Sequence, residues 1–520
     1  MKNKLLMLSI FIVAILAVSA VSANENATDV VSESVGEDME LQEDVSAGID
    51  DEISQKNDAV EPVKENATVE VNKTTSTITS SKVTGYNSFE TTVTFKLTSD
   101  NKPLASKKVS ILLNGVTYSR TTDANGEGSL SVNLKTGSYT AKFYYAGDNQ
   151  TSDATATSTV TVKDPTKTKL SLGDKYINYR QGSKCLFYVK LLTKDGKAIK
   201  NQWVTFKVAG KTYTAKTNNN GIAKIYLNLK KGTYTVKYSF KKSAPYLASS
   251  GSAKIKVKAK MGKGNGYWLW SAHMKKVNLK SLSKRGTKQI FLHVQSIALH
   301  GKSAVVSFIK KAHKYGMKVH LWMQICYSGG KWVRPINKDN TIKYGFLNKK
   351  IKEAKKYAKI KGVDGIHFDY VRFGGTAHLY KDPNRAVNYF IKKASTQIHK
   401  IKPNCIVSAA LMPEPSMMTY YYGQDVSTMS KYVDVLLPMV YKGNYHQTTK
   451  WVKSVTKTFV GQSNGAQVWT GLQSYHSDNN AKKLTQKSLL KDAKASKEGG
   501  AKGVILFRIG ISCNFNFKKV

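Results

Sequence analysis

Two segments of the chain repeat each other at a constant offset of 95 residues. The segment DNKPLASKKVSILLNGVTYSRTT begins at Asp100 and aligns with DGKAIKNQWVTFKVAGKTYTAKT, which begins at Asp195. The same offset relates Gly126 to Gly221 in the turns further along. Because self-similarity at a fixed period reflects a repeated structural unit, we expect the two copies to fold alike.

Each copy has the pattern of an all-β domain. Short alternating stretches rich in Val, Thr and Tyr are separated by Asn-Gly turns in both copies and by a Lys-Gly turn in the second. We therefore expect two β-sandwiches of about ninety residues each, over 73–163 and 166–258. They resemble the bacterial immunoglobulin-like repeats of adhesins and exported archaeal surface proteins. The repeats contain no constellation of residues that looks catalytic, and we expect them to form a stalk.

From about residue 262 the pattern changes to strands that alternate with amphipathic helices. Eight strand candidates begin at residues 266, 289, 318, 365, 406, 433, 467 and 503. The segment 262–520 is close to the length of a (β/α)8 barrel, about 250 residues. The alternative is a doubly wound open sheet. Such a sheet would be expected to carry a Gly-rich phosphate loop after its first strand, and the sequence has none there. We therefore predict an α/β TIM (β/α)8 barrel.

The first 72 residues have the signals of an exported protein. Residues 1–23 combine two lysines, an apolar run and small residues, which is the pattern of a signal peptide cleaved after Ala23. An uncleaved anchor is the alternative, but the apolar run is short for a membrane span. Residues 24–72 hold 15 of the 35 Asp and Glu and no aromatic residue, which predicts an acidic disordered tether. We expect a secreted or cell-surface protein, with no membrane span in the mature chain.

The remainder of the chain is strongly basic. Residues 73–520 carry 77 of the 81 Lys and Arg, and the whole chain has a formal net charge of +46. Nucleic acid, anionic lipid or an acidic wall polymer would be attracted by such a charge. However, the lysines are dispersed and no basic-aromatic nucleic-acid motif occurs, so we expect a solvated surface and no nucleic-acid partner. Affinity for an acidic envelope is the second interpretation.

The cysteines and histidines have no spacing typical of a metal site. The four cysteines lie far apart, and His320 and His367 belong to no His-x-x-x-His pattern. Cys326 lacks a recognisable His and Asn arrangement for nucleophilic catalysis. We therefore expect no metal and no cofactor.

In such a barrel the active site lies at the C-terminal ends of the strands. Glu353, Asp492 and Glu498 fall in lysine-rich helical stretches, where solvated ion pairs are expected. Asp364 and Asp434 precede their strands and therefore belong to the opposite, stabilising face. Two acids at strand ends remain as candidates.

The first of these two acids is Asp369, in the fourth strand, GIHFDYVRF. Strand alternation points one set of side chains into the barrel and the other onto the helices. The inward set is Gly365, His367 and Asp369, and the outward set is Ile366, Phe368 and Tyr370. Since burying unpaired polar groups is costly, a purely structural Asp369 would require a partner such as Arg372 or a neighbouring strand.

The second acid is Glu414, which closes the fifth strand, SAALMPEP, with the same parity as Met412. The alternative is a turn residue beside two prolines. Carboxylates on adjacent strands are what glycoside hydrolysis requires, because one attacks or stabilises the oxocarbenium-like centre and the other protonates the leaving oxygen.

Aromatic and polar residues near the other strand ends complete the candidate site. Tyr441 ends the sixth strand, where its hydroxyl would orient substrate or nucleophile, with core packing as the alternative. Side chains suited to sugar stacking or binding are Trp270, Trp322, Trp332, His367, Arg372, Gln473 and Tyr475.

The motifs DGIHFDYVRF and LLPMVYKGNY resemble those of glycoside-hydrolase-like barrels related to the chitinase and amylase superfamilies. Those families carry an Asp-Gly-Ile-x-hydrophobic-Asp motif on strand four and a Met-x-Tyr pattern on strand six. The resemblance covers about the last half of the chain, as a barrel should. Val371 occupies the position of the catalytic Glu of true chitinases. The resemblance therefore implies the amylase-like arrangement, with Asp369 as nucleophile and Glu414 as acid/base.

Two functions remain open on the sequence. The first is a secreted or cell-surface glycoside hydrolase acting on cell-wall or extracellular polysaccharide. The second is an adhesin-like protein whose barrel binds glycan without cleaving it, since one fold serves both. The Asp369–Glu414 pair favours the first, whereas the repeats and the few other acids at the mouth favour the second.

Overall fold

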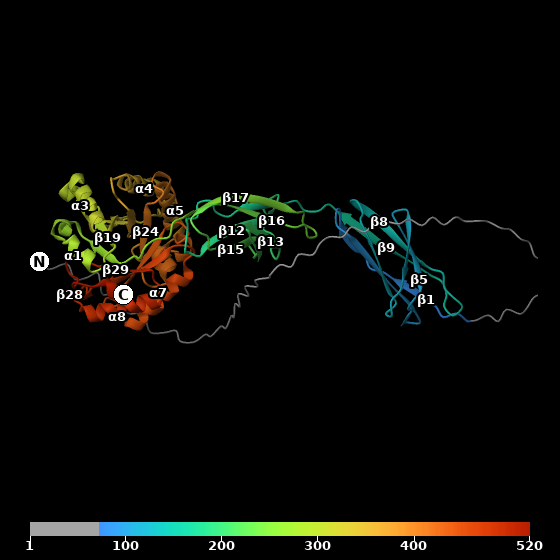
Figure 1. Ribbon diagram of the computed structural model, residues 1–520. Helices are drawn as coiled ribbons and strands as arrows, with labels where there is room; N and C mark the ends of the chain where they lie inside the picture. The colour runs from blue at the N-terminus through green and yellow to red at the C-terminus, as the bar shows by residue number, and fades with distance from the viewer. Residues whose placement is uncertain (1–71) are drawn as a thin grey trace, which may run out of the picture. The chain divides into compact units, whose positions relative to one another are not determined.

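The computed structural model describes residues 72–520 (Figure 1). The predicted signal peptide and all but the last residue of the predicted tether lie outside the described residues. Among residues 72–520, none of the helices combines the length and the apolar character that a membrane span needs.

The first repeat consists of two sheets around a common core. Its strands are β1 (Ser76–Thr79), β2 (Val83–Tyr86), β3 (Thr91–Ser99), β4 (Lys102–Pro103), β5 (Lys108–Leu113), β6 (Val116–Thr121), β7 (Glu127–Val132), β8 (Gly137–Tyr145) and β9 (Ala154–Lys163). One sheet has the order β2-β9-β8-β5-β6, and the other joins β1, β3, β4 and β7. Alternate residues of both sheets point inward, so that Phe95 of β3 packs on Phe143 of β8 with ring centroids 5.5 Å apart.

The second repeat has the same arrangement. Its strands are β10 (Thr168–Leu172), β11 (Tyr179–Arg180), β12 (Cys185–Thr193), β13 (Trp203–Val208), β14 (Lys211–Lys216), β15 (Ile222–Leu227), β16 (Gly232–Phe240) and β17 (Ser249–Lys258). Strands β13 to β17 begin and end 95 residues after β5 to β9. The sheet β11-β17-β16-β13-β14 also repeats the order of its counterpart. The equivalence of the two copies is therefore confirmed, whereas their immunoglobulin-like class stays a prediction.

The C-terminal segment forms a closed barrel of eight parallel strands. In order around the barrel these are β18 (Gly266–Leu269), β19 (Gln289–His293), β20 (Lys318–Gln324), β23 (Gly365–Asp369), β24 (Ile406–Leu411), β25 (Val435–Val440), β26 (Gln467–Gln473) and β29 (Gly503–Phe507). Each strand falls within a stretch expected from the sequence, so the closed eight-stranded barrel is confirmed.

Helices and short hairpins connect the barrel strands (Figure 1). The helices are η1 (Ser271–Lys276), α1 (Leu279–Lys284), α2 (Ser296–His300), α3 (Lys302–Lys314), α4 (Tyr344–Ala358), η2 (Ala377–Leu379), α5 (Asn384–Ile401), η3 (Met418–Tyr422), α6 (Val426–Met429), α7 (Thr449–Gln462), α8 (Gln486–Glu498) and η4 (Phe517–Lys519). The hairpins are β21 (Tyr327–Ser328) with β22 (Lys331–Trp332), and β27 (Tyr475–Ser477) with β28 (Asn480–Lys483).

Two apolar layers support the barrel. The outer layer lies between strands and helices and includes Ile366 and Phe368 of β23, and Phe368 packs on Phe390 of α5 at 5.0 Å. The inner layer fills the barrel and includes Trp268 and Trp469. Strand alternation accounts for this division, because successive side chains point to opposite faces. The outward direction expected for Ile366 and Phe368 is confirmed.

Asp434 anchors the face of the barrel opposite the strand ends. It precedes β25, is only 2% exposed, and accepts hydrogen bonds from Arg180 Nε at 3.0 Å and Asn178 Nδ2 at 2.7 Å, both from the second repeat. His399 Nε2 lies 3.0 Å and the amide of Val407 2.9 Å from its other oxygen. The structural role expected for Asp434 is confirmed, and its carboxylate links the second repeat to the barrel.

One expectation about the helical acids is wrong. Asp492 of α8 is buried rather than solvated, and Lys442 from the segment after β25 pairs with its carboxylate at 2.8 Å. Glu498 has the exposed ion pair that was expected, with Lys453 at 2.9 Å.

Candidate active site

Asp369 is the last residue of β23 and is 7% exposed at the mouth of the barrel. Its Oδ2 accepts a hydrogen bond from Trp322 Nε1 at 3.0 Å, and its Oδ1 accepts one from the amide of Tyr370 at 2.7 Å. Burial raises the pKa of the Asp369 carboxyl, and the Tyr370 amide, the Trp322 indole and the charge of Arg372 offset only part of that rise. The carboxylate is therefore held in one orientation by two donors.

His367, two residues earlier on β23, points into the barrel as expected but is completely buried. Its Nε2 accepts a hydrogen bond from Trp268 Nε1 at 3.1 Å, so its Nδ1 carries the proton and donates to Ser408 Oγ at 3.0 Å. Burial holds the pKa of His367 well below its ordinary value. With both ring nitrogens occupied, His367 has none left for a sugar, and the expected substrate contact does not fit this geometry.

Tyr370 leaves the strand with a left-handed φ of +50°. Its ring therefore stacks on Tyr327 at 4.8 Å instead of packing outward on the helices, and that expectation is wrong. The guanidinium of Arg372 lies over the rings of Trp332 at 4.7 Å, Tyr422 at 5.3 Å and Tyr370 at 5.4 Å. These contacts define an aromatic cage around a cation at the rim of the barrel.

Glu414 lies in the loop after β24 and not on the strand, which ends at Leu411. The strand parity expected for Glu414 therefore does not apply, because Pro413 and Pro415 stop the ladder. Gln424 holds the start of the loop: its Oε1 accepts from the amide of Met412 at 3.0 Å. Its Nε2 donates to the carbonyls of Ala410 at 3.1 Å and Val371 at 3.3 Å.

Two tyrosine hydroxyls adjoin Glu414. Burial and the Glu414 carboxylate raise the pKa of both Tyr422 and Tyr445, so both remain protonated donors at neutral pH. Oε2 of Glu414 is buried and has no hydrogen-bond partner among residues 72–520. Since buried polar atoms are normally paired, this oxygen is available to a ligand.

Tyr441 follows β25 directly, and its ring stacks on Phe507 at 5.6 Å. Burial raises the pKa of Tyr441 well above its ordinary value, and the charge of Asp369 raises it further. Tyr441 therefore lies within the electrostatic reach of Asp369 and keeps its proton.

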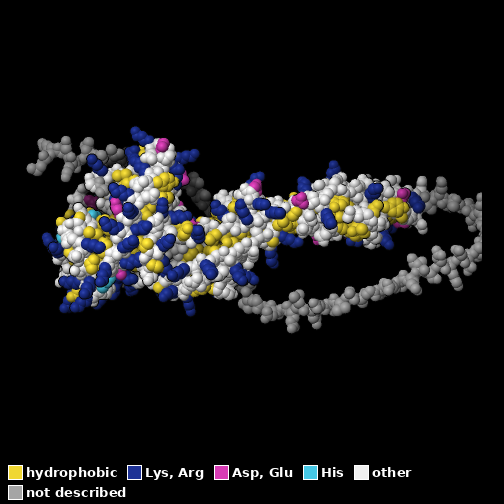
Figure 2. Space-filling model, turned by 90° about the horizontal axis from the view of Figure 1, so that it is seen from above, with side chains coloured by type: hydrophobic (Ala, Val, Ile, Leu, Met, Phe, Trp, Pro, Cys, Tyr) yellow, Lys and Arg dark blue, Asp and Glu magenta, His cyan; other side chains and the backbone are white. Residues whose placement is uncertain are grey.

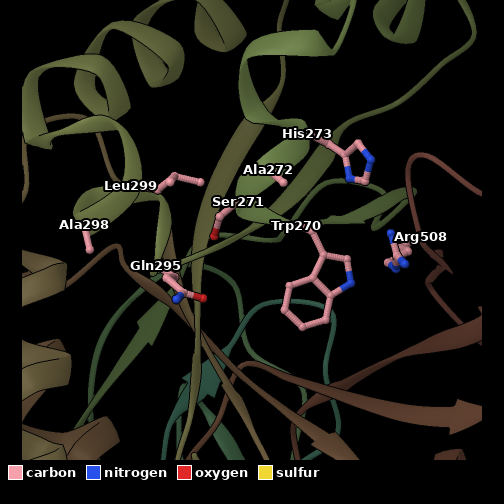
Figure 3. Close-up of a pocket in the computed structure, with 8 residues that line it drawn as sticks. All are labelled: Trp270, Ser271, Ala272, His273, Gln295, Ala298, Leu299 and Arg508. Carbon is pink, nitrogen blue, oxygen red and sulfur yellow. The ribbon is translucent and has the colours of Figure 1, made fainter. Parts of the chain in front are cut away.

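Trp270 and Trp322 have different roles from each other. Trp322 is 1% exposed, so the expected sugar contact does not fit, and its indole instead holds Asp369. Trp270 follows β18 and is partly exposed, with its ring 4.9 Å from that of Trp322. It borders a cavity of about 540 Å³ (Figure 3). The other lining residues are Ser271, Ala272, His273, Gln295, Ala298, Leu299 and Arg508.

Gln473 ends β26, Tyr475 begins β27, and both residues are buried. Gln473 Nε2 donates to Asn444 Oδ1 at 2.8 Å, and Tyr475 donates to Asp478 Oδ1 at 2.6 Å. Their polar atoms thus bind the protein itself, and both side chains support the loops that carry Asn444 and Asp478.

Four further residues of the site were not predicted from the sequence: Tyr422, Tyr445, Gln424 and Arg508. The first three lie in loops or in the short helix η3, where no periodic pattern marks them. Arg508 directly follows β29 and obeys the same strand-end rule that selected Asp369, so that rule was sufficient to find it.

Residues 308–501 match a family model described as "Putative glycosyl hydrolase domain". The matched segment begins within α3, ends before β29, and contains Asp369, Glu414 and Tyr441. The match supports a glycan-acting hydrolase. No curated protein sequence matches the chain.

Three solved structures are similar to parts of the chain. The spore cortex-lytic enzyme SleL of Bacillus megaterium QM B1551 is 14% identical, with 50% of this chain and 74% of that chain covered and a TM-score of 0.36. The endo-1,4-beta-D-mannanase of Thermotoga petrophila RKU-1 is 13% identical over 47% and 88%, with a TM-score of 0.35. Catalytic domain 2 of the Group II chitinase of Ostrinia furnacalis is 12% identical over 41% and 64%, with a TM-score of 0.29.

Proposed function

We propose that the protein is a secreted or cell-surface glycoside hydrolase that acts on cell-wall or extracellular polysaccharide. The observation that carries this proposal is the placement of two carboxylates after neighbouring, paired strands: Asp369 ends β23, and Glu414 follows β24. Each carboxylate adjoins one member of a contacting pair: Arg372 interacts with Asp369, Tyr422 interacts with Glu414, and the Arg372 guanidinium lies over the Tyr422 ring. Two carboxyl groups at one barrel mouth are the minimum that glycosidic cleavage needs.

In the amylase-like arrangement, Asp369 attacks the anomeric carbon while Glu414 donates a proton to the departing glycosidic oxygen. Glu414 then takes a proton from a water molecule, whose oxygen displaces Asp369 from the sugar. Trp322 and the Tyr370 amide aim the attacking carboxylate. The hydroxyl of Tyr441 supplies a protonated donor within electrostatic reach of that carboxylate.

The role of Glu414 as acid is tested by comparing leaving groups. Glu414→Gln should cleave polysaccharide at least about a hundredfold more slowly, yet keep a nearly wild-type kcat/KM on dinitrophenyl glycosides, because departure of such a leaving group in the first step needs no proton. Glu353→Gln, on the outer helix α4, is the matched control and should behave as wild type. An equal loss of kcat/KM with both kinds of leaving group would show that Glu414 is not the acid.

The reaction itself is tested by incubating the full chain with a panel of polysaccharides and measuring new reducing ends. Retention of the anomeric configuration in the first product supports Asp369 as nucleophile, whereas inversion assigns it the activation of water. Binding without any release of reducing ends would favour the adhesin-like alternative instead.

A further inference from the structure

We infer that the polysaccharide carries carboxylate groups, which Arg372 and Arg508 bind on either side of Asp369. This inference names the substrate class of the site proposed above and therefore rests on that proposal for the location of the glycan. The surface provides the general attraction, because Lys and Arg side chains spread across the face shown in Figure 2. The two arginines would provide the specific contacts.

Arg372 is a partly exposed cation without a carboxylate partner. Within residues 72–520 no Asp or Glu oxygen lies within 4.0 Å of its guanidinium, and its Nε is buried with no hydrogen-bond acceptor. Its Nη1 donates to the carbonyl of Phe373 at 3.0 Å. Three aromatic rings fix the plane of the guanidinium, so it is held in place before any ligand arrives.

Arg508 occupies the corresponding position at the other side of the mouth. It lies over the ring of Trp270 at 5.8 Å and lines the cavity of about 540 Å³ (Figure 3). It is partly exposed, and no carboxylate of the described chain lies within 4.0 Å of it either. A sugar stacked on Trp270 would therefore present its substituents to a free guanidinium.

The two arginines are connected by a continuous line of contacts that passes through Asp369. Trp270 under Arg508 packs against Trp322, and Trp322 donates its hydrogen bond to Asp369. The next residue, Tyr370, lies under Arg372. A glycan that spans the mouth with one bond at Asp369 would thus meet one arginine on each side.

Carboxylate is the chemistry that a fixed guanidinium recognises, because its planar fork matches the two oxygens. Arg180 illustrates the contrast within the same chain. Its guanidinium meets Asp434 at the buried base of the barrel, and it is the one arginine among residues 72–520 that forms an ion pair with a carboxylate. The arginines at the mouth lack such a partner and are open to a ligand.

The test measures binding of the full chain to polygalacturonate, alginate and hyaluronan, each beside its carboxyl-reduced form. The reduced polymers keep linkage and length and lose only the charge. At least one acidic polymer should bind about tenfold or more tightly than its reduced form at physiological salt, since hydrogen bonds to charged groups are stronger than those between neutral groups. Arg372→Gln and Arg508→Gln should each reduce that preference.

Arg385→Gln is the matched control, because Arg385 is an exposed arginine of α5 and its loss removes the same charge from the protein. Arg372→Lys keeps the charge without the planar fork and should lose part of the preference. Thermal melting of each variant identifies any that fail to fold, and in that case the Lys variant decides. The inference is overturned if no acidic polymer is preferred, or if Arg385→Gln reduces the preference as much as Arg372→Gln.

Different experimental results would refute the inference and the proposed function. Hydrolysis of neutral polysaccharides alone would support the proposed hydrolase activity and refute the inference of an acidic substrate. Arginine-dependent binding of an acidic polymer without cleavage would support the inference of an acidic ligand and refute the proposal that the protein is a hydrolase.

Discussion

The indole Nε1 of Trp322 lies 3.0 Å from Oδ2 of Asp369 and donates a hydrogen bond to it across two neighbouring strands, β20 and β23. This hydrogen bond stabilises the ionised form of Asp369, whereas burial destabilises that form. It also fixes where the carboxylate points. The proposed nucleophile therefore depends on a tryptophan that no substrate touches.

Replacing Trp322 by Phe should lower kcat about tenfold to a hundredfold, because a hydrogen bond to a charged group contributes ~1.5–3 kcal/mol. Since the indole lowers the pKa of Asp369, its removal should raise that pKa and move the acid limb of kcat/KM to higher pH. A pH–rate profile measures both effects. Trp469→Phe is the control, because Trp469 donates to Gln467 at 2.9 Å instead, and an identical shift there would refute the positioning role.

The raised pKa of Asp369 also predicts a stability signature. A carboxyl whose folded pKa exceeds its unfolded value of about 3.9 contributes stability below that value, which is lost as the pH rises through the folded pKa. The Asn side chain of Asp369→Asn does not titrate. The difference in Tm, wild type minus variant, should therefore be most positive at low pH and decline as the pH rises. A difference that stays constant or grows would contradict the burial of this charge.

Arg180→Met should destabilise the protein by about 3 kcal/mol, because it removes a partner of the buried Asp434 carboxylate. Urea unfolding followed by tryptophan fluorescence reports on the barrel, which holds six of the seven tryptophans. Lys197→Met, which removes an exposed partner of Asp195, should leave the transition unchanged. Equal free energies of unfolding for the two variants would show that the buried Asp434 carboxylate does not depend on its partner in the second repeat.

Tyr441→Phe tests the donor beside Asp369. The variant should fold normally, since its ring packing on Phe507 is preserved. It should lower kcat about tenfold or more with little change in KM, because the removed hydroxyl acts on the reacting groups. A change in KM alone would assign Tyr441 to substrate binding instead.

Much of the fold follows from local patterns in the sequence. The 95-residue offset predicted equivalent strands in the two repeats, and eight strand candidates predicted a closed barrel. Alternation in β23 predicted which side chains enter the barrel, since period 2 is a property of the strand itself. The same pattern carries no information about depth, so it did not distinguish a buried, fully bonded His367 from a group that meets substrate.

The candidate site was less predictable because much of it lies outside regular elements. Strand parity does not apply to Glu414, because Glu414 lies past the end of β24, where two prolines end the ladder. Tyr370 changes direction through a left-handed φ that side-chain type does not indicate. Tyr422 and Tyr445 reach Glu414 from η3 and from a loop, and only the closed barrel brings these segments together.

The most direct test of the central claim is the rate at which full-length Asp369→Asn releases reducing ends from a polysaccharide that the wild type cleaves. Asp382→Asn is the matched control, because Asp382 is exposed and has a φ of +48°, a conformation that Asn tolerates well. The account predicts a loss of about a thousandfold or more for Asp369→Asn and none for Asp382→Asn. Equal rates for Asp369→Asn and the wild type would contradict it.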